Sequence, residues 1–196
     1  MSRHKKKEKR YFNKKNIVGL FIAFIMVSSL LAMWEGGVVE KYNGFKIKTD
    51  GISLQTKING EWVDFGYSPS NLDDMDVSSE AMLTLENSNM VYFTFDPEDK
   101  LLSDIELTRM ILGESLEKNF NIYAPSGVTE QIEPYAALPL IDCSNATSTI
   151  PVVYFKYLNE TKISIENNCI YVYAQSGYDF EALTERIKYG LYGVIE

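Results

Sequence analysis

The sequence has little of what most catalytic sites need. Of its 196 residues, one is histidine and two are cysteine. The histidine, His4, lies in the basic start of the chain, so the rest of the protein cannot build a histidine-activated nucleophile or a histidine-ligated zinc site. No G-x-x-x-x-G-K-[ST] loop and no G-x-G-x-x-G turn occurs, which removes these two routes to nucleotide binding. We therefore predict no catalytic residue, no cofactor and no metal ion.

Basic residues are scarce after the first sixteen positions. Residues 1–16 hold eight of the nineteen Lys and Arg and one acid, Glu8. The other 180 residues carry 11 basic and 26 acidic side chains, a net charge of −15. Contacts to phosphates need clustered Lys and Arg, so nucleic acid is not an expected partner. The composition, 45% hydrophobic and 23% charged, is that of a globular protein and excludes a mostly disordered chain.

One uncharged apolar run stands out near the start. Residues 17–34 contain no charge, and their only polar side chains are those of Ser28 and Ser29. Eighteen helical residues span about 27 Å, just enough for a hydrocarbon core of ~30 Å. A cleavable signal peptide is the alternative, but the run is longer than the usual signal core and ends without a small-x-small cleavage site. We predict a retained transmembrane helix over residues 17–34, in contact with the lipid bilayer.

Charge on either side of this run predicts its orientation. Eight Lys and Arg precede it, and three lie in the twenty residues after it. Lys and Arg are held on the cytoplasmic side of a span, so the N-terminus is expected inside the cell and the C-terminal domain outside, as in a single-pass signal-anchor protein of the cell membrane. The predicted organisation is a basic cytoplasmic tail over residues 1–16, the span over 17–34, a connector over 35–44, and one extracytoplasmic domain over 45–196.

The two cysteines, Cys143 and Cys169, both lie in the domain predicted outside the cell. In an oxidising compartment they are expected to form a disulfide, although a pair of buried thiols is the alternative. Two N-x-[ST] sequons, at Asn145 and Asn159, are candidate glycosylation acceptors. Their number is what chance predicts for this composition, so only their place in polar stretches supports them.

The first part of the domain reads as antiparallel strands. Phe45–Lys48, 52–58 and 61–67 alternate in varying degree between apolar and polar residues. The pairs Asp50-Gly51 and Asn59-Gly60 between them supply the positive φ angles of tight hairpin turns. We predict a three-stranded meander. Further strands are expected at 90–95, 120–123, 152–158, 161–165 and 170–174 from their aromatic and β-branched content.

Two helices are predicted. The first starts at Ser103, where Ser103 and Glu106 fit the S-x-x-E capping box, and ends near residue 119. Its apolar residues lie on two faces, so we expect cover on both sides. The second runs from about residue 180 to 194, with apolar residues at helical spacing. Residues 78–87 fit a helix or a strand. The predicted fold class is α+β, with a mixed β-sheet that includes the N-terminal antiparallel meander and helices packed on one face.

Carboxylates and tyrosines are the remaining candidates for chemistry. Acids cluster at residues 73–76 and 96–99, but neither cluster has the spacing of a calcium loop, and solvated loops are the simpler interpretation. A pair of carboxylates could also hydrolyse glycosidic bonds, although nothing in the sequence selects a pair. The thirteen tyrosines favour packing on sheets over a binding platform.

Several short motifs occur in a fixed order after the basic tail and the span: YNGFKI, ING with a Trp two residues later, FDP, TKI, NCIYV and RIKYGLYGVI. In this order the chain resembles a group of uncharacterised, single-pass membrane proteins found in archaea. The motifs consist of turn and packing residues, so the resemblance implies an anchored, surface-facing domain and no particular activity.

Taken together, these features predict a membrane-anchored extracytoplasmic domain that binds a protein or envelope partner of unknown specificity and is not an enzyme. The alternative is an anchored, carboxylate-dependent hydrolase acting on envelope glycans. A deep cleft with two facing acids would favour the hydrolase, and an open apolar patch would favour binding.

Overall fold

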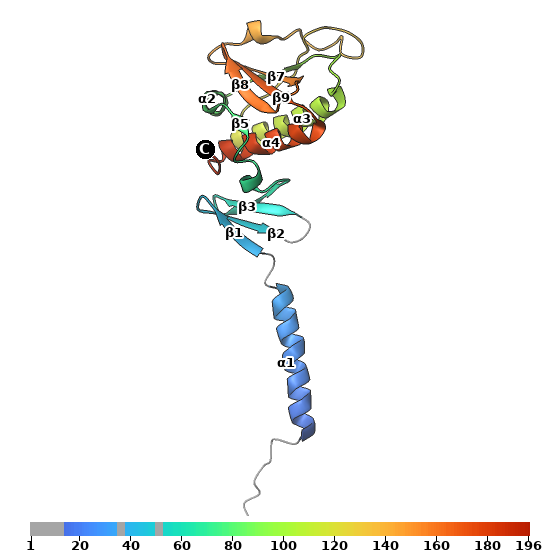
Figure 1. The fold of residues 1–196 in the computed structure, drawn as a ribbon, viewed down its shortest axis with the longest axis vertical. Helices are drawn as coiled ribbons and strands as arrows, with labels where there is room; N and C mark the ends of the chain where they lie inside the picture. The colour runs from blue at the N-terminus through green and yellow to red at the C-terminus, as the bar shows by residue number, and fades with distance from the viewer. Residues whose placement is uncertain (1–13, 35–37, 50–52) are drawn as a thin grey trace, which may run out of the picture. The chain divides into compact units, whose positions relative to one another are not determined.

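The computed structural model of this protein describes residues 14–34, 38–49 and 53–196. The chain divides into two compact units, Met1–Val38 and Val39–Glu196. The first unit contains one helix, α1 (Lys14–Trp34), drawn in blue in Figure 1. The basic tail before residue 14 and the predicted Asp50-Gly51 turn lie outside the described residues.

Helix α1 contains the apolar run. All of its large apolar side chains from Ile17 to Val27 are exposed. The hydroxyls of Ser28 and Ser29 both donate to the carbonyl oxygen of Ile25, at 3.0 and 2.7 Å. Among the helices of the described residues, none combines the length with the apolar character that crossing a membrane requires.

The second unit begins with a four-stranded sheet in the order β1-β2-β3-β4, formed by β1 (Val38–Tyr42), β2 (Phe45–Thr49), β3 (Leu54–Ile58) and β4 (Glu61–Phe65). The β2–β3 and β3–β4 pairs are antiparallel, as predicted. Asn59-Gly60 makes the β3–β4 turn, with φ angles of 49° and 95°. A second Asn-Gly pair, at residues 43–44, adds β1 to the three strands expected from the sequence.

A second sheet contains five strands in the order β5-β8-β9-β7-β6 (Figure 1). The strands are β5 (Asp76–Val77), β6 (Tyr92–Phe95), β7 (Val152–Tyr157), β8 (Lys162–Glu166) and β9 (Cys169–Ala174). Only β8 and β9 pair antiparallel; the other neighbours are parallel. The predicted single mixed sheet is therefore wrong: the meander forms a sheet of its own, and the mixed sheet is separate from it.

The outer side of β6 is covered by irregular chain. Residues 123–129 run parallel to β6 and exchange backbone hydrogen bonds with it, including Phe93 N to Pro125 O at 2.9 Å. No strand forms at 120–123, where one was predicted. Phe120 instead ends a short π-helical turn, η2 (Leu116–Phe120), and Tyr123 forms an isolated parallel bridge with Met90. Gly127 lets residues 139–141 approach, because a Cβ at this position would lie 2.7 Å from the backbone oxygen of Pro139.

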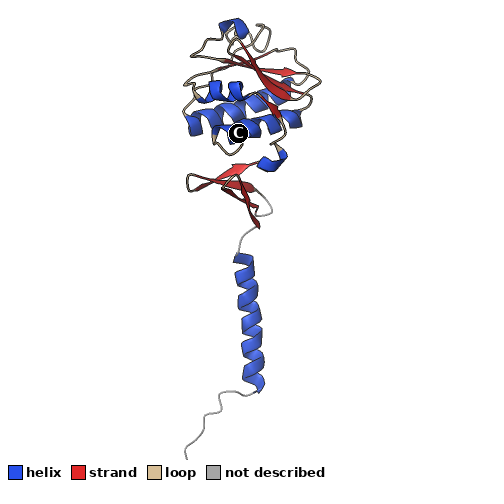
Figure 2. Ribbon diagram, turned by 60° about the vertical axis from the view of Figure 1, so that its left-hand side comes forward, coloured by secondary structure: helices blue, strands red, loops and turns tan. Residues whose placement is uncertain are grey.

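Three helices pack on one face of the second sheet: α2 (Ser79–Glu86), α3 (Leu102–Ser115) and α4 (Gly177–Leu191) (Figures 1 and 2). The main core lies between them and the strands, and Phe93, Phe155 and Phe180 are fully buried there. The predicted cover of one face by helices is confirmed for this sheet. Residues 78–87, which fitted either type of element, form α2 with Ser78 as its N-cap.

The start of α3 differs from the prediction. The helix begins at Leu102, and no side chain caps it from the N-cap position. The Asp99 carboxylate accepts instead from the backbone N–H of Leu101 at 2.9 Å and from that of Tyr157 at 2.8 Å. Glu106 forms an ion pair with Arg109, with 3.1 Å between a carboxylate oxygen and a guanidinium nitrogen. The predicted Ser103–Glu106 capping box is therefore wrong, because Ser103 already lies inside the helix and Glu106 pairs with Arg109.

A smaller core joins the meander to α4. It contains Phe65 of β4, Tyr189 of α4 and the buried residues Val194 and Ile195 after the helix. The rings of Phe65 and Tyr189 stack with centroids 3.9 Å apart. Two short 3₁₀ turns, η1 (Pro69–Asn71) and η3 (Cys143–Asn145), complete the elements of the described residues.

Candidate functional site

Helix α3 exposes a row of apolar side chains to solvent. Leu107, Met110 and Ile111 are 45%, 60% and 42% exposed, and they lie three and four positions apart on one face. The opposite face, with Ile105 and Leu112, is buried in the core. The expectation that α3 is covered on both sides is thus wrong. The described residues cover its second apolar face only in part, and grouped exposed apolar side chains often mark interaction sites.

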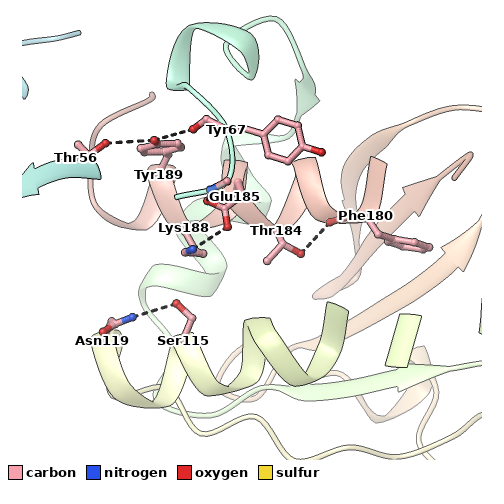
Figure 3. A network of polar contacts seen from close by, with 10 residues as sticks. Thr56, Tyr67, Ser115, Asn119, Phe180, Thr184, Glu185, Lys188 and Tyr189 are labelled. Atoms are coloured by element: carbon pink, nitrogen blue, oxygen red, sulfur yellow. Dashed lines mark hydrogen bonds and ion pairs between the residues drawn. The ribbon is translucent and has the colours of Figure 1, made fainter. Parts of the chain in front are cut away.

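A pocket of about 160 Å³ lies beside this row. Helix α3 forms one wall, helix α4 forms another, and the chain that leaves β4 closes one side. The lining residues are Gly66, Tyr67, Leu107, Thr108, Ile111, Glu181, Thr184 and Glu185. Figure 3 shows the α4 side of this region, with Tyr67, Thr184 and Glu185 labelled.

A shallower hollow of about 240 Å³ continues past Ile111, which lines both spaces. It is bordered by Val63 and Asp64 of β4, the edge strand of the meander, and by the end of α3. Together the pocket, the hollow and the exposed row of α3 form one feature, which we name the α3–α4 groove. Its residues come from three separate stretches of sequence that only folding brings together.

Hydrogen bonds hold the α4 wall of the groove in place. The Glu185 carboxylate accepts from the backbone N–H of Gly66 at 3.1 Å and from the Lys188 ammonium at 2.8 Å (Figure 3). The Thr184 hydroxyl donates to the carbonyl oxygen of Phe180 at 2.9 Å. These contacts fix the Glu185 carboxylate and the Thr184 hydroxyl in place, so this wall of the groove is formed before anything binds.

The polar end of the pocket is formed by Tyr67 and Glu181. Burial first, and then the charge of Glu181 and a hydrogen bond to its carboxylate, raise the pKa of the Tyr67 phenol. Tyr67 therefore stays neutral and donates to Glu181. The carboxylate of Glu181 takes part in none of the salt bridges formed by the described residues.

The two cysteines selected from the sequence come together. Cys143 in η3 and Cys169 in β9 lie at disulfide distance, with Cα atoms 5.3 Å apart. They join the loop that covers part of the second sheet to the strand beneath it, beside the buried Val152. The candidate glycosylation residues Asn145 and Asn159 are both exposed, the first in η3 and the second just after β7. Their modification stays a prediction.

The acidic cluster at residues 96–99 binds backbone N–H groups in the structure. The Asp96 carboxylate accepts from the N–H of Glu98 at 2.9 Å, and Asp99 holds the start of α3 and the end of β7. No group of three or more metal-binding side chains occurs within residues 14–34, 38–49 and 53–196. Asp96 and Asp99 therefore act as acceptors at a turn and at the start of a helix.

The tyrosines of the second sheet lie on the face away from the helices. Tyr171 and Tyr173 stack with centroids 5.4 Å apart, and Tyr154 tilts against Tyr171 at 5.9 Å. All three are partly buried. Burial raises the pKa of both the Tyr154 and the Tyr173 phenol. The three rings therefore pack on one another.

Sequence reasoning did not identify the groove. The signal was the second apolar face of α3, with Leu107 and Ile111 on it, but a sequence pattern cannot distinguish a face covered by its own chain from one left open. Tyr67 and Glu181 carried no signal, because their closeness depends on how the chain after β4 passes α4.

Comparisons with models of known protein families, with curated proteins and with solved structures find no match to this chain. The α3–α4 groove therefore has to be interpreted from its own geometry.

Proposed function

We propose that this protein is a membrane-anchored domain, exposed outside the cytoplasm, that binds a segment of a partner protein in the α3–α4 groove. The single observation that carries the binding part is the row of Leu107, Met110 and Ile111, exposed on a helix whose other face is buried. Apolar side chains grouped beside a preformed pocket stabilise a complex by leaving water on binding.

The membrane part of the proposal rests on the sequence. Eighteen consecutive uncharged residues, 17–34, follow a tail rich in Lys and Arg. Two features of α1 support it: its large apolar side chains from Ile17 to Val27 are exposed, and both serine hydroxyls are paired with the backbone of the helix itself. Paired hydroxyls lower the cost of placing serine among lipid chains.

Charge favours a partner with basic residues over a nucleic acid or an anionic lipid surface. The part of the chain after residue 16 has a net charge of −15, and the groove itself contains four acids: Asp64, Glu114, Glu181 and Glu185. Its two basic residues, Lys118 and Lys188, are already paired with Glu114 and Glu185. The groove is therefore apolar along α3 and negative along its rim.

The hydrolase alternative gains no support from this geometry. Glycoside hydrolysis needs two carboxyl groups facing each other across the scissile bond. Glu181 and Glu185 line the pocket from the same helix, one turn apart, and Glu185 already holds Lys188 and Gly66. No observation among the described residues favours this second function.

Site-specific photo-crosslinking in cells tests the binding part. A benzoylphenylalanine placed at Met110 should give a protein adduct, and mapping should find the crosslinked segment rich in apolar residues. The same probe at Leu83, which is 56% exposed on α2, is the matched control. Equal labelling from both positions, no adduct from position 110, or an adduct with lipid alone would contradict the proposal.

Membrane attachment is tested separately by alkaline extraction and protease protection. The full chain should remain in the membrane fraction, and its C-terminal domain should be cleaved only from outside the cell. Recovery of the full-length chain in the soluble fraction would refute the anchor and would leave the groove proposal standing.

A further inference from the structure

The pocket in the α3–α4 groove is apolar along its length and carries a negative charge at one end. Leu107 and Ile111 form the apolar side on α3, and the only carboxylates in its lining are Glu181 and Glu185. Glu185 is paired with Lys188, with side chains that are both only 12% exposed. The charge offered to a ligand is therefore that of Glu181.

Glu181 lies between a hydrogen-bond donor and solvent. The Tyr67 phenol donates to its carboxylate, and the residue itself is exposed on the first half of α4. A carboxylate has about four lone-pair sites, so one tyrosine leaves most of its acceptor capacity unused. A cation placed here would gain charge-assisted hydrogen bonds without displacing any ion pair.

One aromatic ring belongs to the same pocket. Tyr67 lines it together with Glu181. Tyrosine faces attract ammonium and guanidinium groups, so this ring and Glu181 favour the same kind of ligand.

We propose that this pocket takes the side chain of a lysine or arginine from the partner segment. Its methylene stem would lie along Leu107 and Ile111, and its charged end would meet Glu181 beside the ring of Tyr67. Long basic side chains combine an apolar stem with a charged tip. The pocket matches both parts, with an apolar side for the stem and a carboxylate for the tip. The inference rests on the proposed function, because it names the anchor residue of the segment that binds in the groove.

The test uses small probes that contain only the side chain. The full protein is placed in phosphatidylcholine nanodiscs, and the methyl NMR signals of Leu107 and Ile111 are followed during titration with n-butylammonium or with n-butanol, its neutral analogue. We expect saturable shifts with n-butylammonium at millimolar concentration, as for any ligand of this size. Glu181→Gln should weaken n-butylammonium binding about fivefold, the upper range for an exposed ion pair, and leave n-butanol unaffected.

Glu86→Gln on α2 is the matched control, because it removes the same charge outside this pocket. If Glu181→Gln and Glu86→Gln weaken binding equally, the effect is one of net charge and the inference fails. Equal shifts with n-butanol and n-butylammonium would show an apolar groove without a basic-side-chain pocket. No shift with either probe would also refute the inference, whereas a segment-specific crosslink from position 110 would still support the groove as a docking site.

Discussion

Tyr189 provides the sharpest test of how the two sheets of the domain are held together. Its ring is fully buried and stacks on Phe65 of the meander. Its hydroxyl donates to the carbonyl oxygen of Tyr67 at 2.9 Å and lies 3.2 Å from the hydroxyl of Thr56 in β3 (Figure 3). One α4 residue thus contacts β3, β4 and the chain that follows them.

Tyr189→Phe removes these hydrogen bonds and keeps the ring. The carbonyl of the half-buried Tyr67 and the fully buried hydroxyl of Thr56 then each lose a partner. Leaving a buried polar group unsatisfied costs about 1–3 kcal/mol, and no cavity adds to this because the ring remains. A loss of ~2 kcal/mol corresponds to a fall of roughly 4–8 °C in Tm for a domain of this size.

The assay is urea unfolding of the full chain in detergent, followed by tryptophan fluorescence and by far-UV circular dichroism. In a Trp34→Phe background, fluorescence reports on Trp62 in β4, while circular dichroism reports on the helices. We expect Tyr189→Phe to lower the midpoint by both probes together, because Tyr189 couples the meander to α4. Tyr178→Phe, at an exposed position, should change stability by no more than about 0.5 kcal/mol.

Two results would refute this reasoning. One is a midpoint for Tyr189→Phe that differs no more from the unsubstituted protein than that of Tyr178→Phe. The other is a transition that already separates into two steps in the unsubstituted protein, since the meander would then unfold independently of α4. A Thr56→Val substitution combined with Tyr189→Phe measures the coupling directly, and it should cost less than the sum of the two single changes.

Three further predictions concern other parts of the domain. Replacing Cys143 and Cys169 by serine should cost about 3–4 kcal/mol on the chain-entropy model for a loop of this length, and equal urea midpoints with and without reductant would contradict it. Gly127→Ala places a methyl group 2.7 Å from a backbone oxygen and should cost roughly 1–3 kcal/mol in thermal unfolding, unless the loop at 139–141 can move away. Burial, and then the neighbouring Asp73 carboxylate, raise the pKa of Tyr42 to about 12. Since the unfolded chain loses this proton near pH 10, stability should fall as pH rises from 10 to 12, and Tyr42→Phe should reduce that slope.

Much of the local structure follows from short stretches of sequence. Asn59-Gly60 fixes a two-residue hairpin because both positions take positive φ, which asparagine and glycine tolerate best. The aromatic run at β6 and the apolar spacing of α4 predicted their elements to within a few residues. The pairing of Cys143 with Cys169 could be predicted from the sequence, because the chain has only two cysteines.

Predictions that depended on neighbours distant in sequence were less successful. The S-x-x-E pattern at Ser103 predicted a capping box, but Asp99, which also accepts from the N–H of Tyr157 in β7, accepts from Leu101 just before the helix, and Glu106 pairs with Arg109. The meander was expected to continue into the mixed sheet. It forms a sheet of its own because Phe65 packs against Tyr189, so that its core lies against α4.

The sequence by itself determined the uncharged run, the acidic domain, the turns and the apolar faces of the helices, since each depends on residues only a few positions apart. Only the tertiary structure decided which of those faces stays open. Leu107 and Ile111 look in sequence like residues of a second core, and they stay partly exposed because α4 and residues 66–67 border that side of α3 without closing over it. The meeting of Tyr67 with Glu181, more than a hundred residues later, likewise depends on packing between elements, which a local pattern does not contain.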